Sequence, residues 1–324
     1  MKKRQLLRTV LTLAAAGLTL GAHAQDFPPK KTITMVVGFA AGGAADTGAR
    51  IIAKKLGENI GASVVVDNRA GAGGNIAHQY TAQGPSDGSL ILFGSVGPLT
   101  IAQHMMKLPY DPVKDLSPIT MGVNFPNVLV VHPGAGIKTF GEFVAAAKKN
   151  PGKIELASTG VGSASHLAAE LLNDMAGIDT VHVPYKGGAP ALQDVLAGRV
   201  TGWFATMATA SQHIESGKLI ALASSGAQRV PGLPKVPTIA ESGYPGFNAT
   251  NWYAFVASAK VPKPILDRWN TELVKMLSAP DVVEQLNKHG LTPMPGSREE
   301  LARYIASESN MWGRIIRDRK ITAD

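Results

Sequence analysis

Residues 35–46 read MVVGFAAGGAAD. An apolar, β-branched stretch runs into a turn rich in glycine and alanine that ends at Asp46, and a helical pattern follows from Thr47 to Leu56. This order is typical of a strand, a loop with exposed backbone and the start of a helix. Such a loop presents free N–H groups and the positive end of a helix dipole to an anion. An ordinary strand-to-helix turn has the same pattern, so this loop alone leaves both interpretations open.

A second loop of the same kind occurs later in the chain, at residues 157–166 (ASTGVGSASH). It again follows an apolar stretch and precedes a helical pattern. Two anion-binding loops in one exported chain indicate the capture of a small carboxylate.

Export is predicted from the first 24 residues, which have the three parts of a secretory signal peptide. Residues 1–4 (MKKR) are basic, residues 10–20 are apolar, and Ala22–Ala24 matches a small-x-small cleavage site. The apolar run is too short to span a bilayer, and no later segment is apolar for long enough. The chain has no cysteine, which excludes disulfides and a lipid anchor on an N-terminal cysteine. We therefore expect cleavage after Ala24 and a periplasmic mature protein, not lipid-anchored, that begins at Gln25.

The net charge of +8 overstates the charge of the mature protein. Four cations (Lys2, Lys3, Arg4 and Arg8) lie in the predicted signal peptide, and subtracting them from +8 leaves about +4. The remaining positive charges are scattered and lack the interleaved aromatic residues of a single-strand binder, so no nucleic-acid partner is expected. A mild positive excess suits an acidic ligand. About 300 mature residues suffice for two domains with a large core and no disulfides.

Strand and helix patterns alternate along most of the chain, which favours an α/β fold with parallel sheets covered on both faces by helices. Residues 109–118 show no core pattern and are predicted to be a connection, and the last helix opens with a capping box, Ser297-x-x-Glu300. We expect strands at residues 32–37, 63–66, 89–93, 127–131, 153–158, 180–183, 200–205, 220–223 and 250–258. We expect helices at residues 46–60, 76–83, 139–149, 166–176, 191–197, 265–277, 282–288 and 298–317.

Two extended segments, residues 124–131 and 250–256, are predicted to cross between two lobes. The first lobe would contain residues 25–125 and 251–324, and the second would be residues 126–250. Ligands of such sheets bind beyond the carboxyl ends of the strands, where both glycine loops lie. The loops are therefore expected to face an interlobe cleft, and closure of such a cleft on a ligand is typical of a capture protein.

Five blocks of the sequence carry a family resemblance. They are VVGFAAGGAAD (36–46) with Arg50, DNRAGAGGNIA (67–77), ASTGVGSASHLAAE (157–170), VPYKGGAPALQDVLAGRV (183–200), and VPTIAESGYPGF (236–247) followed by NWYAFVA. In this order they closely resemble the Bug or TctC-like extracytoplasmic solute receptors of tripartite tricarboxylate transporters. The resemblance extends over essentially the whole predicted mature chain.

The resemblance implies a monomeric Venus-flytrap receptor that captures a small carboxylate and delivers it to inner-membrane transporter subunits. It implies no enzymatic activity, no cofactor and no metal. Backbone N–H groups of the cleft loops would bind the carboxylate, with help from ordered water. The implied ligand-binding residues are Phe39, Ala40, Ala41, Gly42, Gly43, Ala44, Asp46, Gly73, Gly74, Asn75, Ser95, Gly97, Ser158, Thr159, Gly160, Ser163, His166, Tyr185, Lys186, Gly187, Ala189 and Thr206.

Several of these residues have a second interpretation that the sequence leaves open. Asp46 and Ser163 are good N-caps for the helices that follow them. His166 is either a buried hydrogen-bonding residue or a titrating one. Lys186 either offers charge to the ligand or braces its turn. Trp252–Tyr253, at the return crossing, are predicted to pack in the core or the hinge.

One stretch departs from the family pattern. Many relatives have aspartates in a GxVDxxFD-like run, whereas residues 198–205 here read GRVTGWFA without an acid. A carboxylate there would help to bind a ligand ammonium. Its absence favours plain or hydroxylated carboxylic acids over amino acids, although Asp46 could still bind an ammonium.

Other functions fit the sequence less well. Gly38-x-x-x-Gly42-Gly43 is not the G-x-G-x-x-G of a dinucleotide site, and no P-loop is present. A periplasmic hydrolase is a remote alternative, since Ser163 follows Gly162 but G-x-S-x-G is not satisfied. The eight histidines are scattered, without H-E-x-x-H. The same receptor fold acting as a ligand sensor for a signalling partner remains open.

Overall fold

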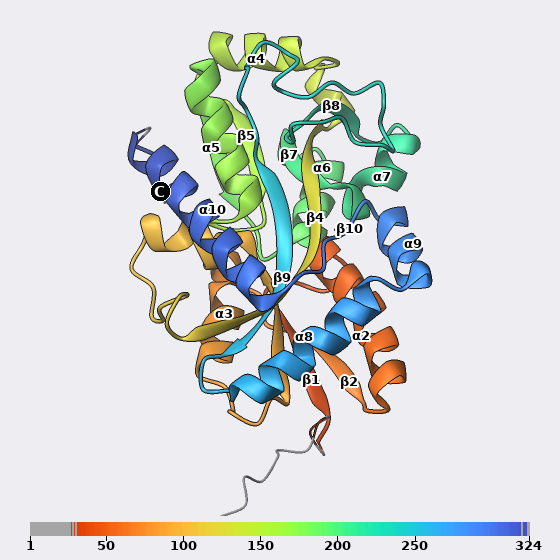
Figure 1. Cartoon of the computed structure of the whole chain (residues 1–324). Coiled ribbons are helices and arrows are strands. Elements are labelled where there is room, and N and C mark those ends of the chain that lie inside the picture. Colours follow the sequence, from red (N-terminus) through yellow and green to blue (C-terminus); the bar gives the residue numbers. More distant parts are fainter. Residues whose placement is uncertain (1–26, 28, 30, 319, 323–324) are drawn as a thin grey trace, which may run out of the picture.

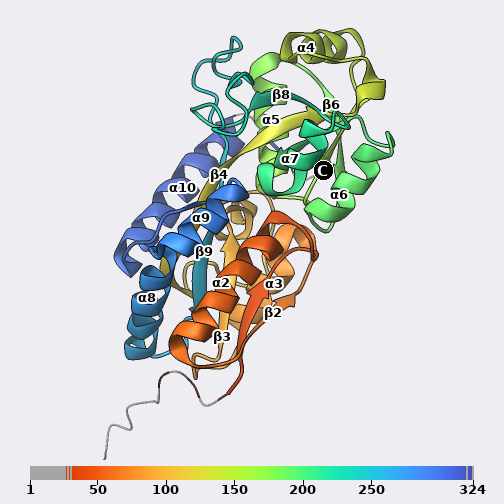
Figure 2. The same cartoon turned by 90° about the vertical axis from the view of Figure 1, so that its right-hand side faces the viewer.

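The computed structural model describes residues 27, 29, 31–318 and 320–322, so the predicted signal peptide lies outside the described residues. Two α/β lobes are stacked one above the other, with strands β4 and β9 at their junction (Figures 1 and 2). The predicted two-lobe α/β fold is confirmed. Lobe 1, the lower one in Figure 1, contains both ends of the described chain, and lobe 2 lies between them in sequence.

Lobe 1 is built around a sheet that helices cover. Its strands are β1 (Ile33–Val37), β2 (Val64–Asn68), β3 (Leu90–Ser95), the first part of β4 (Leu116–Val131), β9 (Thr250–Ser258) and β10 (Thr292–Pro293). Its helices are α2 (Ala44–Ile60), α3 (Asn75–Ala82), α8 (Lys263–Leu277), α9 (Pro280–Lys288) and α10 (Arg298–Asp318), with short helical turns at Ala72–Gly74, Gly97–Ile101 and Ala102–His104.

Lobe 2 repeats the α/β arrangement. Its strands are the second part of β4, β5 (Ile154–Ser158), β6 (Thr180–Pro184), β7 (Gly202–Thr206) and β8 (Ile220–Ser224). Its helices are α4 (Phe140–Lys149), α5 (Ala164–Ala176), α6 (Gly188–Leu196) and α7 (Met207–Glu215), with a short turn at Pro133–Ala135.

The strands follow the order β2-β1-β3-β9-β4-β7-β5-β6, with β8 and β10 also paired to β4. The predicted parallel pairing occurs in the outer part of each lobe, where β1 pairs with β2 and β3, and β5 with β6 and β7. The central pairs that involve β4 and β9 are antiparallel. The carboxyl ends of the parallel strands, and the loops that follow them, are thereby directed toward the junction of the lobes.

Strand β4 belongs to both lobes. Its first part pairs with β9 as far as Pro126, and Asn127–Val131 pairs with β7 and β8. The sequence predicted only residues 127–131 as strand here and assigned residues 109–118 to a connection, so the strand begins earlier than predicted. Pro118 and two register shifts interrupt the alternation of inward and outward side chains in the first part of β4, so the sequence pattern did not indicate a strand there.

The predicted helices begin within three residues of their predicted positions, and the largest shift is that of α6, which begins at Gly188 rather than Ala191. Helix α2 begins at Ala44 rather than Asp46, and α5 begins at Ala164 rather than His166. Helix α7 was not predicted, because Ala210 is its only buried residue and its apolar stripe is weak. The predicted capping box is present, since Glu300 N–H donates to Ser297 Oγ at 3.1 Å and Ser297 N–H to Glu300 at 2.7 Å.

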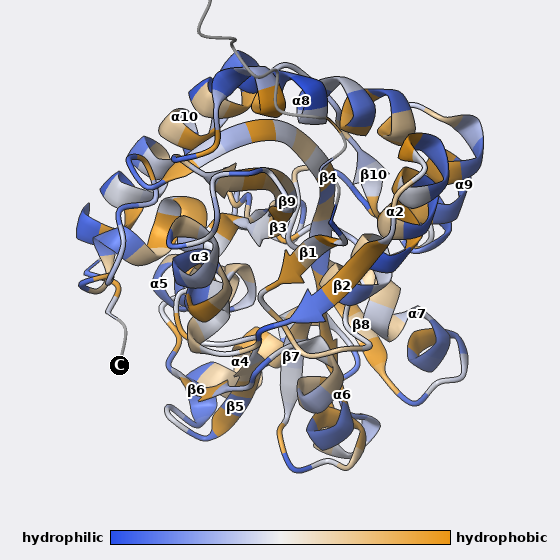
Figure 3. Cartoon of the chain, turned by 90° about the horizontal axis from the view of Figure 1, so that it is seen from below, coloured by the Kyte–Doolittle hydropathy of each residue, from blue (hydrophilic) through white to orange (hydrophobic). Residues whose placement is uncertain are grey.

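The core of lobe 1 holds the two elements that flank the first glycine loop, strand β1 and helix α2. Met35 is fully buried between strands, and α2 turns Ala49 and Ile52 inward while Arg50 faces solvent. Figure 3 shows β1 as an apolar strand among helices that are apolar on one side and polar on the other. No helix in the described part of the chain is both long and apolar enough to cross a membrane.

Candidate functional site

The first glycine loop contacts the opposite lobe directly. Ala40 N–H donates to the carbonyl oxygen of Lys186 at 3.0 Å. A Cβ on Gly187 would lie 2.9 Å from Ala40 N, and one on Gly43 would lie 3.6 Å from Gly188 N. The loop after β1 in lobe 1 therefore packs against the loop that precedes α6 in lobe 2.

The other loops of the two lobes approach each other even more closely. A Cβ on Gly73 would lie 2.2 Å from the carbonyl oxygen of Val161, and one on Gly160 would lie 2.7 Å from Gly73 N. Only glycine permits such an approach of backbone to backbone. We call this line of contact, formed by Gly73, Gly97, Gly160 and Gly187 with their neighbours, the glycine seam. The two lobes are closed against each other along it.

A small cavity of about 20 Å³ lies behind the glycine seam. This volume is enough for about one or two water molecules, so a carboxylate of several carbon atoms requires the lobes to separate. Five of the predicted residues line the cavity: Phe39, Ser95, Thr159, Ser163 and Thr206. Other polar or aromatic residues that line it were not predicted: Asn127, Ser165, Trp203, Phe204, Asn251 and Tyr253.

Four polar atoms at this cavity have no hydrogen-bond partner among the described residues. They are Ser95 Oγ, Asn127 Nδ2, Trp203 Nε1 and Asn251 Oδ1. Each belongs to a side chain that is more than nine-tenths buried. A buried polar group without a partner costs about 1–3 kcal/mol, so a group of four marks a place where a polar ligand or water binds. Most of these atoms are hydrogen-bond donors, which suits an anion.

No charged side chain of the described residues lines this cavity. Asp46 is buried nearby, but its carboxylate accepts Gly42 N–H at 3.0 Å and pairs with Arg50 at 2.9 Å. Burial would raise the pKa of Asp46, but hydrogen bonds from Arg50, Gly42 and Asn68 outweigh it and lower the pKa. Asp46 therefore holds the loop from inside the first turn of α2, rather than capping a helix that starts at Thr47.

The second glycine loop uses several of its own N–H groups within lobe 2. The bonds are Thr159 N–H to Ser165 Oγ (3.0 Å), Gly160 N–H to Ser158 Oγ (3.0 Å) and Gly162 N–H to His166 Nδ1 (3.2 Å). Ser163 also caps α5, since its Oγ accepts His166 N–H at 3.4 Å. These three N–H groups already have acceptors within lobe 2 in this closed conformation. The sequence instead predicts that they are free to bind the ligand. The hydroxyl groups of the loop remain close to the cavity.

His166 lies behind the loop and does not line the cavity. Its ring stacks on His182 with centroids 3.9 Å apart, and His182 Nε2 is hydrogen-bonded to Ser158 Oγ. Burial, and secondarily the neighbouring His182, lower the pKa of His166 to about 3. The ring is therefore neutral, as the buried interpretation of this residue requires. The serine hydroxyl that contacts a histidine ring here is that of Ser158, bonded to His182, and neither His166 nor His182 lines the cavity, which does not favour a hydrolase.

The remaining predicted residues fall into two groups, and their roles stay predictions. The first group belongs to the loops on the two sides of the glycine seam: Ala40, Ala41, Gly42, Gly43, Ala44, Gly73, Gly74, Gly97, Gly160, Lys186, Gly187 and Ala189. The second group points its side chains elsewhere. Asn75 is bonded to Tyr110 at 2.8 Å, and Tyr185 donates to Asp194 at 2.7 Å. The side chain of Lys186 is exposed.

The missed residues share a signal that sequence reasoning could have used. Asn127 and Asn251 are polar residues set at the start of apolar strand segments, VLVV and WYAFVA. Tyr253 was predicted to pack in the core, and its ring does contact Phe125, with centroids 5.1 Å apart. It also lines the cavity, and burial raises the pKa of its hydroxyl. That hydroxyl is therefore protonated and able to donate.

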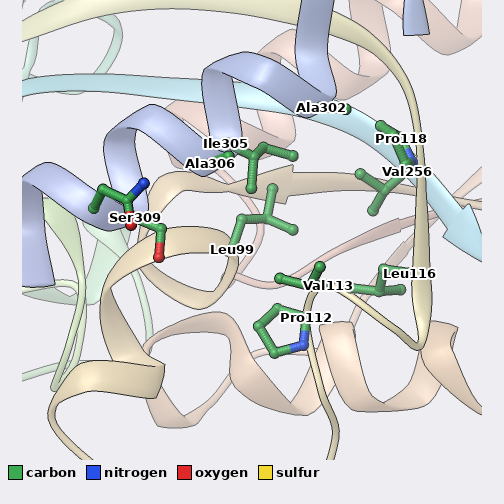
Figure 4. Close-up of a pocket in the computed structure, with 11 residues that line it drawn as sticks. Leu99, Pro112, Val113, Leu116, Pro118, Val256, Ala302, Ile305, Ala306 and Ser309 are labelled. Carbon is green, nitrogen blue, oxygen red and sulfur yellow. The ribbon is translucent and has the colours of Figure 1, made fainter. Parts of the chain in front are cut away.

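A larger pocket of about 270 Å³ lies between α10 and residues 112–118 (Figure 4). Its walls are mainly apolar and include Leu99, Val113 and Ile305. The hydroxyl of Ser309 at its edge is already bonded to Gln103 at 2.8 Å. None of the unpaired buried polar atoms of the described residues lines this pocket, so it is the weaker candidate for an anion. The described residues also contain no cluster of three or more potential metal ligands.

Comparisons with known proteins extend over nearly the whole chain. A family model described as "Tripartite tricarboxylate transporter family receptor" matches residues 48–321. "Protein BugT" of Bordetella pertussis is 35% identical over 321 residues, which are 98% of each protein. The structure "R. palustris Rpa4515 with adipate" is 32% identical with a TM-score of 0.87, and covers 92% of this chain and 99% of that one. MatC from Rhodopseudomonas palustris with bound malate is 30% identical with a TM-score of 0.85, covering 89% and 99%.

Proposed function

This chain belongs to the tripartite tricarboxylate transporter receptor family, and from that premise we propose that it captures a small carboxylate in the periplasm and delivers it to the membrane subunits of a transporter. The main support is the group of four unpaired polar atoms, most of them donors, at an uncharged cavity between two closed lobes. Adipate and malate, the acids named with two similar structures, agree with a carboxylate ligand. The protein acts as a monomeric receptor, without catalysis.

The anion is bound by neutral groups rather than by a cation. Helix α2 begins at Ala44 and α5 at Ala164, and the first N–H groups of a helix lack intrahelical partners. The positive ends of both helix dipoles add a favourable potential near the cavity. Hydroxyl groups of Ser95, Thr159 and Ser163 supply further donors. An exposed Lys186 on the rim contributes to attraction of the anion rather than to its final contacts.

Capture requires the lobes to open and close about the crossing strands. We place the lobe boundaries at residues 125–126 and 250–251, next to the point after Pro126 where β4 changes its pairing partner from β9 to β7. Ser225 ties both crossings together. It accepts Asn127 N–H at 3.0 Å through Oγ and donates from Oγ to the carbonyl oxygen of Ala249 at 2.9 Å. Rotation about this tied point separates the glycine seam and admits the ligand.

The ligand is an acid without an ammonium group. No carboxylate among the described residues lines the cavity, and Asp46 is engaged by Gly42 and Arg50. An ammonium would therefore be desolvated without a counter-charge, at a cost of several kcal/mol. This supports the preference for plain or hydroxylated acids over amino acids.

A thermal-shift screen of organic acids, followed by calorimetry, tests the proposal. A ligand present at a hundred times its Kd adds about 2.7 kcal/mol of stability when only the native state binds, so the melting temperature should rise clearly. A broad panel without any shift, on protein shown to be free of ligand, would count against the receptor. Turnover of an acid would favour an enzyme. The intact mass of the exported protein tests cleavage after Ala24.

A further inference from the structure

Two asparagines from neighbouring strands meet at the junction of the lobes. Asn127 lies on β4, directly after the residues that pair with β9, and Asn251 lies on β9 opposite Phe125. Asn251 Nδ2 donates to Asn127 Oδ1 at 3.5 Å, and both side chains line the cavity. Asn127 is 1% exposed and Asn251 is 8% exposed. Asn127 Nδ2 and Asn251 Oδ1 have no partner among the described residues.

The unpaired groups do not depend on how the two amides are oriented. A carboxamide offers a C=O acceptor and an NH₂ donor, and a bond between two such groups uses one acceptor and one donor. If both amides are turned over, the bond reverses, and Asn127 Oδ1 and Asn251 Nδ2 become the free groups. In either orientation the pair presents one free acceptor and one free donor to the cavity.

A hydroxyl group is the ligand feature that satisfies such a pair, because it both donates and accepts. A carboxylate only accepts, so it would leave the amide carbonyl facing another oxygen. A methylene group would leave both groups desolvated and unpaired, which is unfavourable. An ammonium only donates. The pair is thus chemically distinct from the donors that suit the carboxylate.

The neighbouring strands extend this arrangement. In the sheet, β3, β9, β4 and β7 are consecutive, and each contributes one of the four unpaired atoms. Ser95 Oγ on β3 and Trp203 Nε1 on β7 lie on the strands that flank the asparagine pair. Trp203 Nε1 is a donor only, so it cannot replace the free acceptor of the asparagine pair. Among the four unpaired atoms, the asparagine pair supplies the one free amide acceptor and the one free amide donor.

We propose that Asn127 and Asn251 recognise a hydroxyl group on the ligand, and that the ligand is therefore a hydroxycarboxylate. The inference rests on the proposed carboxylate receptor and specifies its ligand class. It goes beyond binding of the carboxylate itself, which the loops and helix ends provide.

Calorimetry with matched acids that differ by one hydroxyl tests this directly. The pairs are malate and succinate, lactate and propionate, and citrate and tricarballylate. We expect the hydroxy acid of the best-fitting pair to bind at least about tenfold more tightly, because a site built to bond a hydroxyl discriminates strongly against its absence. Equal binding of both members of every pair that binds would overturn the inference and leave the receptor intact. No binding by any acid would overturn both.

Variants identify the residues responsible. Asn251→Ala and Asn127→Ala should each reduce the ratio of the two affinities toward one, mainly by weakening the hydroxy acid. Asn124→Ala is the matched control, since Asn124 lies on the same strand but does not line the cavity. It should leave the ratio unchanged. A ratio that survives in both cavity variants would assign the discrimination elsewhere. The wild-type ratio needs no variant, so the inference stays testable if a variant fails to fold.

Discussion

Gly97 and Gly162 touch across the glycine seam, where a Cβ on Gly97 would lie 2.5 Å from the carbonyl oxygen of Gly162. The three atoms nearest to that position all belong to Gly162 and Ser163 of the opposite lobe. Gly97 does not have a positive φ, so its own backbone would accept a side chain. The close approach of the lobes, rather than local conformation, requires glycine here.

Gly97→Ala should therefore separate closure from folding. We expect unfolding stability to stay the same or rise by as much as about 1 kcal/mol, since alanine reduces the entropy of the unfolded chain. The Kd of the ligand should increase at least about tenfold, equivalent to about 1.4 kcal/mol, because the closed state is blocked. Calorimetry and thermal unfolding measure the two effects. Gly141→Ala in α4, with no atom within 4 Å of its Cβ position, is the control. Unchanged affinity in Gly97→Ala would show that ligand binding does not need this closure.

The second prediction concerns Asp46, whose lowered pKa makes stability depend on pH. Asp46→Asn should cost about 1–3 kcal/mol at pH 7, because the ion pair to Arg50 is lost at a buried site. The pKa is lowered from 3.8 in the folded state, so this contribution is present above about pH 4 and is lost as the pH falls through the folded pKa. Urea unfolding at several pH values should show that the free energies of unfolding of the wild type and of Asp46→Asn become equal at acidic pH. Asp281→Asn, which removes an exposed pair with Lys55, should change the stability much less, because solvent screens the pair. Equal losses in both variants would contradict a special role for Asp46.

The third prediction concerns the stacked histidines. Burial lowers the pKa of His182 to about 4, and burial with His182 lowers that of His166 to about 3. Between pH 6.5 and these values the unfolded chain binds more protons, so stability decreases as the pH falls, by about 1.4 kcal/mol per pH unit for each histidine. In His166→Asn the free energy of unfolding should depend less steeply on pH, by up to about 1.4 kcal/mol per pH unit, because one histidine is removed. Denaturant unfolding between pH 7 and 5 measures it. His289→Asn, which removes an exposed histidine, is the control variant. If His166→Asn and His289→Asn change the pH dependence of stability equally, the buried histidine pair is not its source.

The fourth prediction uses Trp203 as a reporter. Trp203 is one of the residues that line the cavity, and its Nε1 has no partner among the described residues, so ligand binding should change its fluorescence. Trp203→Phe should abolish most of that change and weaken binding by about 0.5–1.5 kcal/mol, the net value of one hydrogen bond. Trp269→Phe is the control, because Trp269 Nε1 already donates to Gly88 at 3.0 Å within lobe 1. A signal that persists in Trp203→Phe would place the ligand away from this side chain.

The sequence predicted those features that depend on local chemistry. The turn after Val37, the cap at Ser163 and the box at Ser297 follow from neighbouring residues, and the structure has all three. The seam and the cavity depend instead on contacts between distant residues. Nothing local to Asn127 indicates that Asn251 lies beside it, and the same holds for Gly73 and Val161. Only the pairing of β4 with β9 and the closure of the lobes bring these residues together.

The position of β9 between β3 and β4 constrains the order in which the lobes can form. A chain that emerges from its N-terminus has β3 and β4 long before β9 is available to join them. Lobe 2 between the crossings needs no later segment to complete its own strand pairing, since β4 to β8 supply it. Lobe 1 must wait for residues 250–258 and for the helices that follow. The strand pairing of lobe 2 can therefore be complete before that of lobe 1, although β1 to β3 of lobe 1 come first in the sequence.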